Sequence, residues 1–195
     1  MRLKKKSTLL ALVLAVILAA AASYYYFAVY NSQHDVFAGI SEYKGYTTAQ
    51  GLYAGADLVV IGSPIKAYKD RKTHISRAST GFIMAFATFT EIKVEKVLRG
   101  PEADAVDLTV IEPVLITQTL KGKERMGLEG YTEMKKGSKY LIFLGKNSNG
   151  QYSVINMHAG KYNIDGTDPE DMRMSDHLKQ RIYRDIKERY LKDVE

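Results

Sequence analysis

The sequence predicts a mainly β fold in which long, bent strands wrap into a small closed barrel. The longest segment with strand chemistry is Phe82–Gly100, which is rich in aromatic, β-branched and threonine residues and contains no proline. Its apolar side chains hold one parity from Ile83 to Phe89 and the opposite parity from Ile92 onward. Because a slip of one residue reverses every side chain, a bulge or a sharp coil near Thr90 is expected to restore one buried face. Bent strands of this length are typical of small barrels.

Shorter segments with strand chemistry lie on both sides of this long segment. Asn149-Gly150 is the strongest hairpin signal in the chain, and it separates two of them. Pro113 interrupts another and is expected to mark a break or an edge. The first of these segments, which begins at Ala56, could continue past Pro64 to Tyr68. In chain order the expected strands are Ala56–Gly62, Phe82–Gly100, Ala105–Thr117, Tyr140–Leu144, Tyr152–Met157 and an edge piece at Lys161–Ile164.

The C-terminal segment is expected to form an amphipathic helix. Asp168 is a capping residue and Pro169 suits the first turn, so the helix should begin there. We expect its apolar side to pack on the barrel, and a partner-binding helix is the alternative. The residues that recur every four positions are Met174, Leu178, Ile182, Ile186 and Tyr190.

The N-terminal segment, residues 1–30, predicts a membrane anchor. Met1–Lys6 is basic, and no formally charged residue follows before Asp35. Leu9–Tyr30 would span roughly 33 Å as a helix, which is enough for a bilayer core. Basic residues before the span favour a cytoplasmic N-terminus, which places the rest of the chain outside the cytoplasm.

Lipid contact is expected along this helix, with tyrosines in the interfacial belt. The alternative is a cleaved signal peptide, with cleavage near Ala19–Ala22 and a secreted domain. Residues 31–45 would form a tether and residues 46–195 the domain. The expected anchor contacts are Leu9, Leu12, Val16, Tyr24, Tyr25 and Tyr26.

Composition and motifs exclude several function classes. The formal net charge of the 195 residues is +6, but four basic residues precede the span, so the remainder carries 24 − 22, or +2. A net charge of +2 is not typical of a domain that binds nucleic acid. The chain has no cysteine, which removes thiol chemistry and cysteine-based zinc sites.

We therefore expect no catalytic residue, metal or cofactor, and a protein that is not an enzyme. No histidine pair has a zinc-binding spacing, and neither a G-x-S-x-G nor a phosphate-binding glycine motif occurs. The four histidines lie in four different regions: His34, His74, His158 and His177.

The most basic stretch after the N-terminus is Lys66–Arg77, between the first two expected strands. One interpretation is a solvated hairpin loop. The other is contact with an anionic membrane surface or wall polymer. The loop Thr119–Lys136 is the second place where we would expect a ligand. The expected anion contacts are Lys66, Lys69, Arg71, Lys72 and Arg77.

Three blocks give the chain a family resemblance. Ala56–Gly62, Phe89–Gly100 and Lys136–Leu144 resemble the "ADxVVxG", "VLKG" and "GxxYLxFL" patterns of exported bacterial domains similar to tissue inhibitors of metalloproteinases. The resemblance covers about Ala56–Asp165. It implies a five- to six-stranded OB-like Greek-key barrel, here with the C-terminal α-helix and the N-terminal transmembrane helix.

Members of this kind are mainly anchored or secreted, without assigned chemistry. The animal inhibitors chelate the protease zinc through an N-terminal cysteine, which this chain lacks, so that mechanism does not carry over. We expect a binding or scaffolding domain at the cell surface. Its partners would be the membrane and either a cell-surface protein or an anionic polymer, and not nucleic acid. The alternative is a protease-inhibitor-like module that acts through exposed loops.

Overall fold

The computed structural model describes residues 2–38, 44–173 and 177–191, apart from the side chains of residues 2–7 and 37. The chain forms two compact units, which are taken separately below. The first unit joins Met1–Val36 with Ile116–Met126, and the second joins Phe37–Leu115 with Gly127–Glu195.

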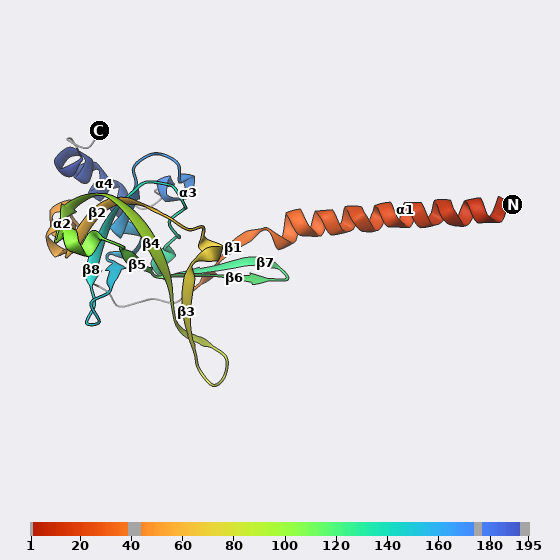
Figure 1. Ribbon diagram of the computed structural model, residues 1–195, viewed down its shortest axis with the longest axis horizontal. Coiled ribbons are helices and arrows are strands. Elements are labelled where there is room, and N and C mark those ends of the chain that lie inside the picture. The colour runs from red at the N-terminus through yellow and green to blue at the C-terminus, as the bar shows by residue number, and fades with distance from the viewer. Residues whose placement is uncertain (1, 39–43, 174–176, 192–195) are drawn as a thin grey trace. The chain divides into compact units, whose positions relative to one another are not determined.

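A closed five-stranded barrel forms the body of the second unit (Figure 1). Each strand pairs with the next in the order β2, β4, β5, β9 and β8, and β8 pairs back with β2. Only the β5–β9 pairing is parallel. The predicted OB-like barrel is therefore confirmed. The strands are β2 (Leu58–Pro64), β4 (Ile83–Arg99), β5 (Thr109–Glu112), β8 (Tyr140–Lys146) and β9 (Tyr152–Val154), and β10 (Lys161–Asn163) pairs with β8.

Strand β4 carries polar side chains into the barrel. The bulge expected near Thr90 is wrong, because pairing with β5 is regular there. The irregularities of β4 lie elsewhere, at Met84 opposite β3 (Lys72–Arg77) and at Glu95 and Leu98 opposite β2. The inward residues around this point are Thr88, Thr90 and Ile92, which are all buried. The apolar residues of the other parity lie outside. The parity change in the sequence thus reflects threonines in the interior rather than a bulge.

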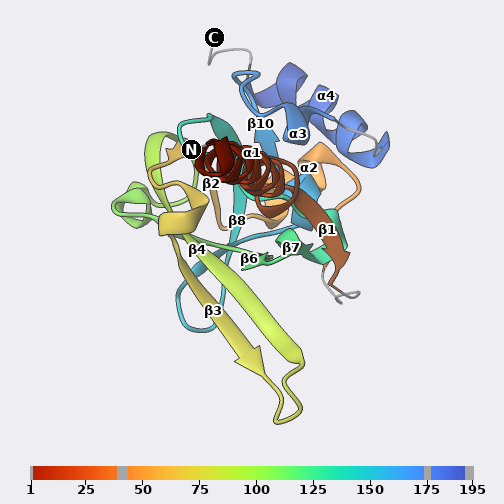
Figure 2. The same cartoon turned by 90° about the vertical axis from the view of Figure 1, so that its right-hand side faces the viewer.

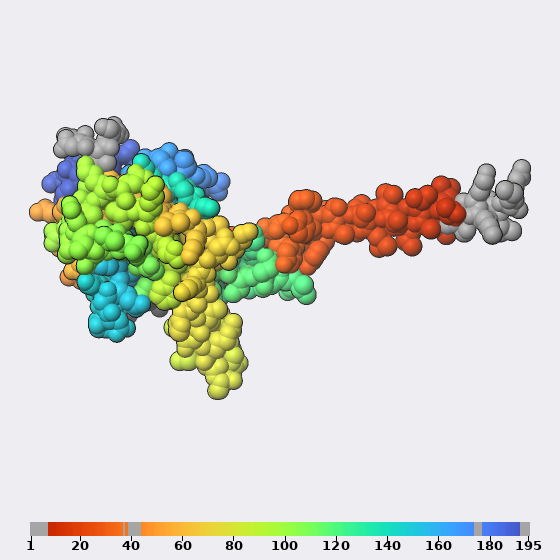
Figure 3. All heavy atoms as spheres, in the orientation of Figure 1, coloured from red at the N-terminus to blue at the C-terminus, as the bar shows by residue number. Residues whose placement is uncertain are grey.

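The first half of β4 forms a projecting hairpin with β3 (Lys72–Arg77), which follows a short 3₁₀ turn, η2 (Tyr68–Asp70). The loop expected over Lys66–Arg77 is therefore largely a strand. Gly81 closes the hairpin with φ of +88°, a left-handed conformation that favours glycine. We call residues 72–87 the arm. Figure 2 shows the arm leading away from the other barrel strands, and Figure 3 shows it, in yellow, standing clear of the barrel.

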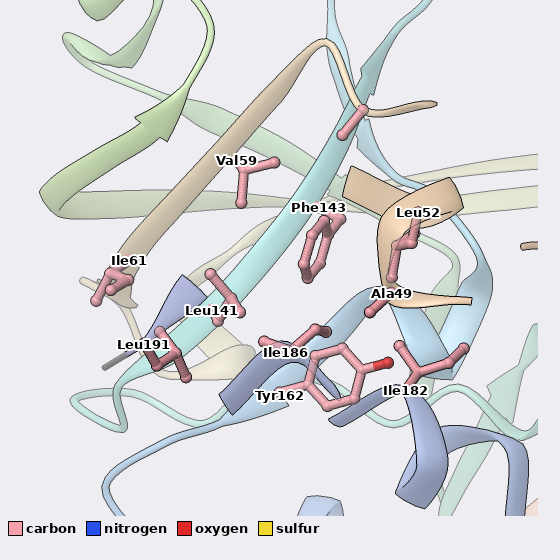
Figure 4. Packing of buried hydrophobic residues seen from close by; sticks show 11 residues of the cluster. Ala49, Leu52, Val59, Ile61, Leu141, Phe143, Tyr162, Ile182, Ile186 and Leu191 are labelled. Carbon is pink, nitrogen blue, oxygen red and sulfur yellow. The ribbon is translucent and has the colours of Figure 1, made fainter. Parts of the chain in front are cut away.

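The opposite side of the barrel is covered by two helices, α2 (Ala49–Gly55) and α4 (His177–Tyr190). All of Tyr140–Leu144 is buried because β8 has the barrel interior on one face and these helices on the other. Figure 4 shows the side chains that converge between the barrel and the helices. They are Ala49, Leu52, Ala56, Val59, Ile61, Leu141, Phe143, Tyr162, Ile182, Ile186 and Leu191.

The C-terminal helix is confirmed, but it begins later than expected. Asp168 caps only a single turn, α3 (Pro169–Met172), where its side chain accepts from the backbone N–H groups of Glu170 and Asp171. α4 then presents Ile182 and Ile186, both buried, to the barrel. Met174 lies outside the described residues.

The remaining strands form a second, three-stranded sheet in the order β1-β7-β6. The expected strand Ala105–Thr117 is divided at Pro113 between β5 and β6, as the proline predicted. β1 lies in the expected tether, of which residues 39–43 are outside the described part of the chain, and β7 lies in the expected loop Thr119–Lys136. The bounds are β1 (Gln33–Phe37), β6 (Val114–Thr119) and β7 (Gly122–Gly127), and the 3₁₀ turns are η3 (Glu102–Ala105), η4 (Leu128–Gly130) and η5 (Met157–Gly160).

The first unit contains one long apolar helix. It consists of α1 (Arg2–Tyr24) and a π-helical turn, η1 (Tyr25–Tyr30). Its segment Thr8–Tyr30 is long and apolar enough to cross a membrane, a property that signal sequences share. The expected anchor residues Leu9, Leu12, Val16, Tyr24, Tyr25 and Tyr26 are all exposed on it.

Candidate binding site

The five basic residues expected to contact an anion do not form one patch. Lys66, Lys69, Lys72 and Arg77 are exposed, and Lys66 pairs with Glu91 at 2.6 Å. Arg71 is buried, so it cannot reach a ligand in solution. The interpretation of Arg71 as a surface contact is therefore wrong.

Arg71 instead neutralises a carboxylate inside the barrel. Its Nη1 donates to Glu112 Oε1 at 2.9 Å, and both side chains are fully buried. Thr90 also donates to Oε1, while the Tyr131 hydroxyl and the Met134 N–H donate to Oε2 at 2.9 and 2.8 Å. Thr90, which faces the barrel interior from β4, thus donates a hydrogen bond to the buried carboxylate of Glu112. With Glu112 bonded at both oxygens, the network is structural.

A second buried charge cluster fixes α3 and α4 to β10. Lys161 and Lys179 donate to Asp171 Oδ1 at 2.6 and 2.8 Å, and no side chain of the three is more than 6% exposed. Burial opposes the charge on Asp171, but the two lysines outweigh it and lower its pKa. Burial, reinforced by the charge of Lys161, lowers the pKa of Lys179 to about 8.

This cluster predicts a stability maximum on the alkaline side. Above pH 8 Lys179 is neutral in the folded chain but remains protonated in the unfolded chain up to its usual pKa of 10.5. The unfolded state then binds more protons, so the free energy of unfolding should rise, by at most on the order of 3 kcal/mol. Above pH 10 it should fall, because burial raises the pKa values of Tyr131 and Tyr140, which keep protons that the unfolded chain releases.

Urea unfolding of the detergent-solubilised chain from pH 7 to pH 11, followed by tyrosine near-UV circular dichroism, measures this profile. Lys179→Met should remove the rise between pH 8 and pH 10 and keep the fall above it. A wild-type profile without any rise in that interval would contradict the assignment to Lys179.

The outer surface of β4 and β5 contains an open hollow of about 240 Å³. Its apolar part comes from Phe89 of β4, from Ile111 of β5, and from Val106 and Leu108 in the segment between η3 and β5. Asp107 of the same segment adds a carboxylate to the lining. Thr109 and Gln151 add a hydroxyl and an amide, and Gln151 belongs to the connection between β8 and β9. The hollow therefore combines apolar surface with hydrogen-bonding groups from three parts of the barrel.

One wall of the hollow is held by three hydrogen-bonded side chains. Asp104 of η3 accepts from Lys146 Nζ at 2.8 Å and from the Tyr152 hydroxyl at 2.6 Å. These bonds, that of Lys146 first, lower the pKa of Asp104. Burial and the bond to Asp104 raise the pKa of Tyr152. Asp104 is therefore charged and Tyr152 protonated at neutral pH, which keeps this wall in one hydrogen-bonded arrangement.

The strand register connects the hollow to the arm. Ile111 lies opposite Phe89, and Phe89 lies opposite Lys72. Side chains that are directly opposite each other in paired strands project from the same face, so the three form a row across β5, β4 and β3. His74 follows next to Lys72, opposite Ala87. We call the hollow together with this row the outer face.

The outer face corresponds to a surface that OB-like barrels use for ligands, namely the second and third barrel strands with the adjoining loops. Lys72 is exposed, and among the described residues no carboxylate pairs with it. Within the described part of the chain, no three His, Cys, Asp or Glu side chains gather as metal ligands. The face is suited to hydrogen bonding, stacking and charge pairing.

Sequence reasoning identified Lys72 but missed most of the outer face. The hairpin signal Asn149-Gly150 could have placed Lys146 near Tyr152, because the two residues pair across that turn. No local signal joins Asp104 to them, since η3 reaches the hollow only through the tertiary fold.

Comparison with protein-family models and with curated proteins finds no match for this sequence. The resemblance to exported OB-like domains therefore stays a prediction. Its three blocks lie in β2, β4 and β8, which are neighbours in the order β4-β2-β8.

Proposed function

We propose that this chain is a non-enzymatic binding domain, held at a membrane by its N-terminal helix, whose outer face binds an extended anionic polymer such as an acidic glycan. The row Lys72–Phe89–Ile111, which leads into the hollow, is the observation that carries the proposal. The basic head before the apolar helix favours a domain outside the cytoplasm. Glycans are more accessible than nucleic acids on that side of a membrane.

The size of the hollow supports a polymer rather than an enclosed small molecule. Sites that enclose a drug-sized ligand occupy about 300–1,000 Å³, and this one holds about 240 Å³ and is open. A ligand would lie across it and continue along the row toward the arm. Phe89 is half-buried and supplies an apolar ring edge, while Thr109 and Gln151 supply hydrogen bonds.

Charge favours an anion at the arm end of this path. No acidic residue occurs between Asp70 and Glu91, a segment that includes the whole arm. Lys72 and Arg77 are both exposed there. On the arm, a polyanion would therefore meet cations without opposing carboxylates, whereas the far end of the path, in the hollow, is lined by Asp104 and Asp107.

Lys72→Glu is expected to weaken the binding of an acidic polysaccharide at least about tenfold, because a charge-assisted contact contributes roughly 1.5–3 kcal/mol. Titration of the full chain in nanodiscs of neutral lipid with polygalacturonate, and with neutral dextran of matched length, measures this. Arg184→Glu is the matched control, since Arg184 is exposed on α4 and makes the same charge change away from the outer face. Equal losses in both variants, or equal binding of dextran, would contradict the proposal.

A protease-inhibitor-like module is the second candidate, and the tip of the arm favours it. Phe82 is 77% exposed at the end of a projecting hairpin, a shape that a protease cleft can accept. Screening the same nanodisc preparation against exported proteases separates the candidates, because inhibition would depend on Phe82 and polymer binding on Lys72.

A further inference from the structure

The tip of the β6–β7 hairpin is bonded to the end of the apolar helix. The Tyr25 hydroxyl donates to the Leu120 carbonyl at 2.8 Å, and Gln118 Nε2 donates to the Tyr30 carbonyl at 2.9 Å. Just after the helix ends, the Ser32 carbonyl accepts from the Lys123 N–H of β7 at 2.8 Å. All of these residues belong to the first unit.

Gly122 allows this close approach. Its φ is +116°, and a Cβ there would lie 2.5 Å from Ser32 Oγ and 2.9 Å from the Val29 carbonyl oxygen. Any larger residue would push the hairpin away from the chain that continues the helix. The hairpin tip is thus fixed at one level along the helix axis.

That level coincides with the expected boundary of the bilayer. A hydrocarbon core of about 30 Å takes roughly 20 helical residues. Counted from Ser7, which follows the last charged residue before the span, those residues end at Tyr26. The Leu120 carbonyl, bonded to Tyr25, therefore lies where acyl chains give way to headgroups.

The chemistry of the tip suits this position. Leu120 is 78% exposed, among the most exposed large apolar side chains described. Lys121 beside it is also exposed, and no acidic residue occurs between Glu112 and Glu124. An apolar residue followed closely by lysines, as Leu120 is by Lys121 and Lys123, is typical of a segment that rests in the interface, with its cations at the lipid phosphates.

We propose that residues 119–122, the tip of the β6–β7 hairpin, form a second membrane contact that enters the leaflet in which the helix ends. Leu120 inserts between the ends of the acyl chains, and Lys121 contacts phosphate groups. The inference rests on the proposed membrane anchoring. The bilayer is the occupant because it must surround the helix at the height where the tip is bonded.

Single-tryptophan variants test the depth of the tip, since the chain contains no tryptophan. Leu120→Trp and Val16→Trp are made in the full chain and reconstituted into vesicles of phosphatidylcholine and phosphatidylglycerol. Lipids brominated at shallow or deep acyl positions then act as quenchers. We expect Leu120→Trp to show a blue-shifted emission that shallow bromines quench most, and Val16→Trp to be quenched most by deep bromines.

The two variants test the membrane anchor and the hairpin contact separately. If Val16→Trp is quenched and Leu120→Trp is not, the hairpin contact is wrong and the anchor stands. If neither variant is quenched, the anchor itself fails. A nitroxide on Leu120→Cys, the sole thiol in a chain without cysteine, gives a second measurement through its accessibility to oxygen and to a water-soluble nickel complex. Greater accessibility to nickel than to oxygen would overturn the contact.

Discussion

Replacing Glu112 with leucine is expected to lower the free energy of unfolding by about 3–5 kcal/mol, because Arg71 is left as an unpaired charge inside the barrel. Both side chains of this pair are fully buried. Tyr131 and Thr90 also lose their acceptor. Urea unfolding of the detergent-solubilised chain, followed by tyrosine near-UV circular dichroism, measures the loss.

Two controls isolate the buried charge. Glu91→Leu removes an exposed carboxylate paired with Lys66, and it should cost less than about 1 kcal/mol. The double variant Arg71→Met with Glu112→Leu should lose less than Glu112→Leu alone, because it leaves no charge unpaired. A double variant that is less stable than the single one would show that the ion pair itself, and not the abandoned cation, stabilises the barrel.

Phe143→Ala is expected to lower the free energy of unfolding by about 3–5 kcal/mol through the cavity that it leaves. Phe143 is fully buried in the cluster between β8 and the two covering helices, and its ring lies edge-on to Tyr162 at 6.2 Å between centroids (Figure 4). The cluster cannot easily collapse onto the space, because it is bounded by the barrel on one side and by α2 and α4 on the other. Thermal unfolding gives the size of the effect.

Phe82→Ala is the matched control for this substitution. It removes the same atoms from a ring that is 77% exposed, so the change in unfolding free energy should stay within about 0.5 kcal/mol. Similar losses in the two variants would mean that the arm tip is packed against the domain in solution.

Signals that act over a few residues predicted much of the fold. Asn149-Gly150 closes the hairpin between β8 and β9, and Pro113 divides β5 from β6. The cap at Asp168 begins a helix, although only one turn of it. Each of these three features depends on the conformational or capping preference of one or two residues, and those residues can be identified from the sequence alone.

Signals that depend on distant partners were not predictable in the same way. The inward position of Thr90 on β4 and the buried position of Arg71 both follow from Glu112, which lies in another strand. The outer face depends on the register between β3, β4 and β5, and register is a property of pairs of strands. A basic run in a sequence therefore does not distinguish a cation that faces water from one that faces a buried carboxylate.

One strand of 17 residues, β4, forms part of the barrel wall and one strand of the arm. The length of the arm can therefore vary without a change in the packing that stabilises the barrel. The base of the strand is fixed at Thr88 and Thr90, where hydroxyls bond to the Val114 carbonyl and to Glu112. Residues added to both arm strands in pairs keep every side chain on its original face. The length of the hairpin can therefore change in steps of two residues per strand, while the strands of the barrel keep their register.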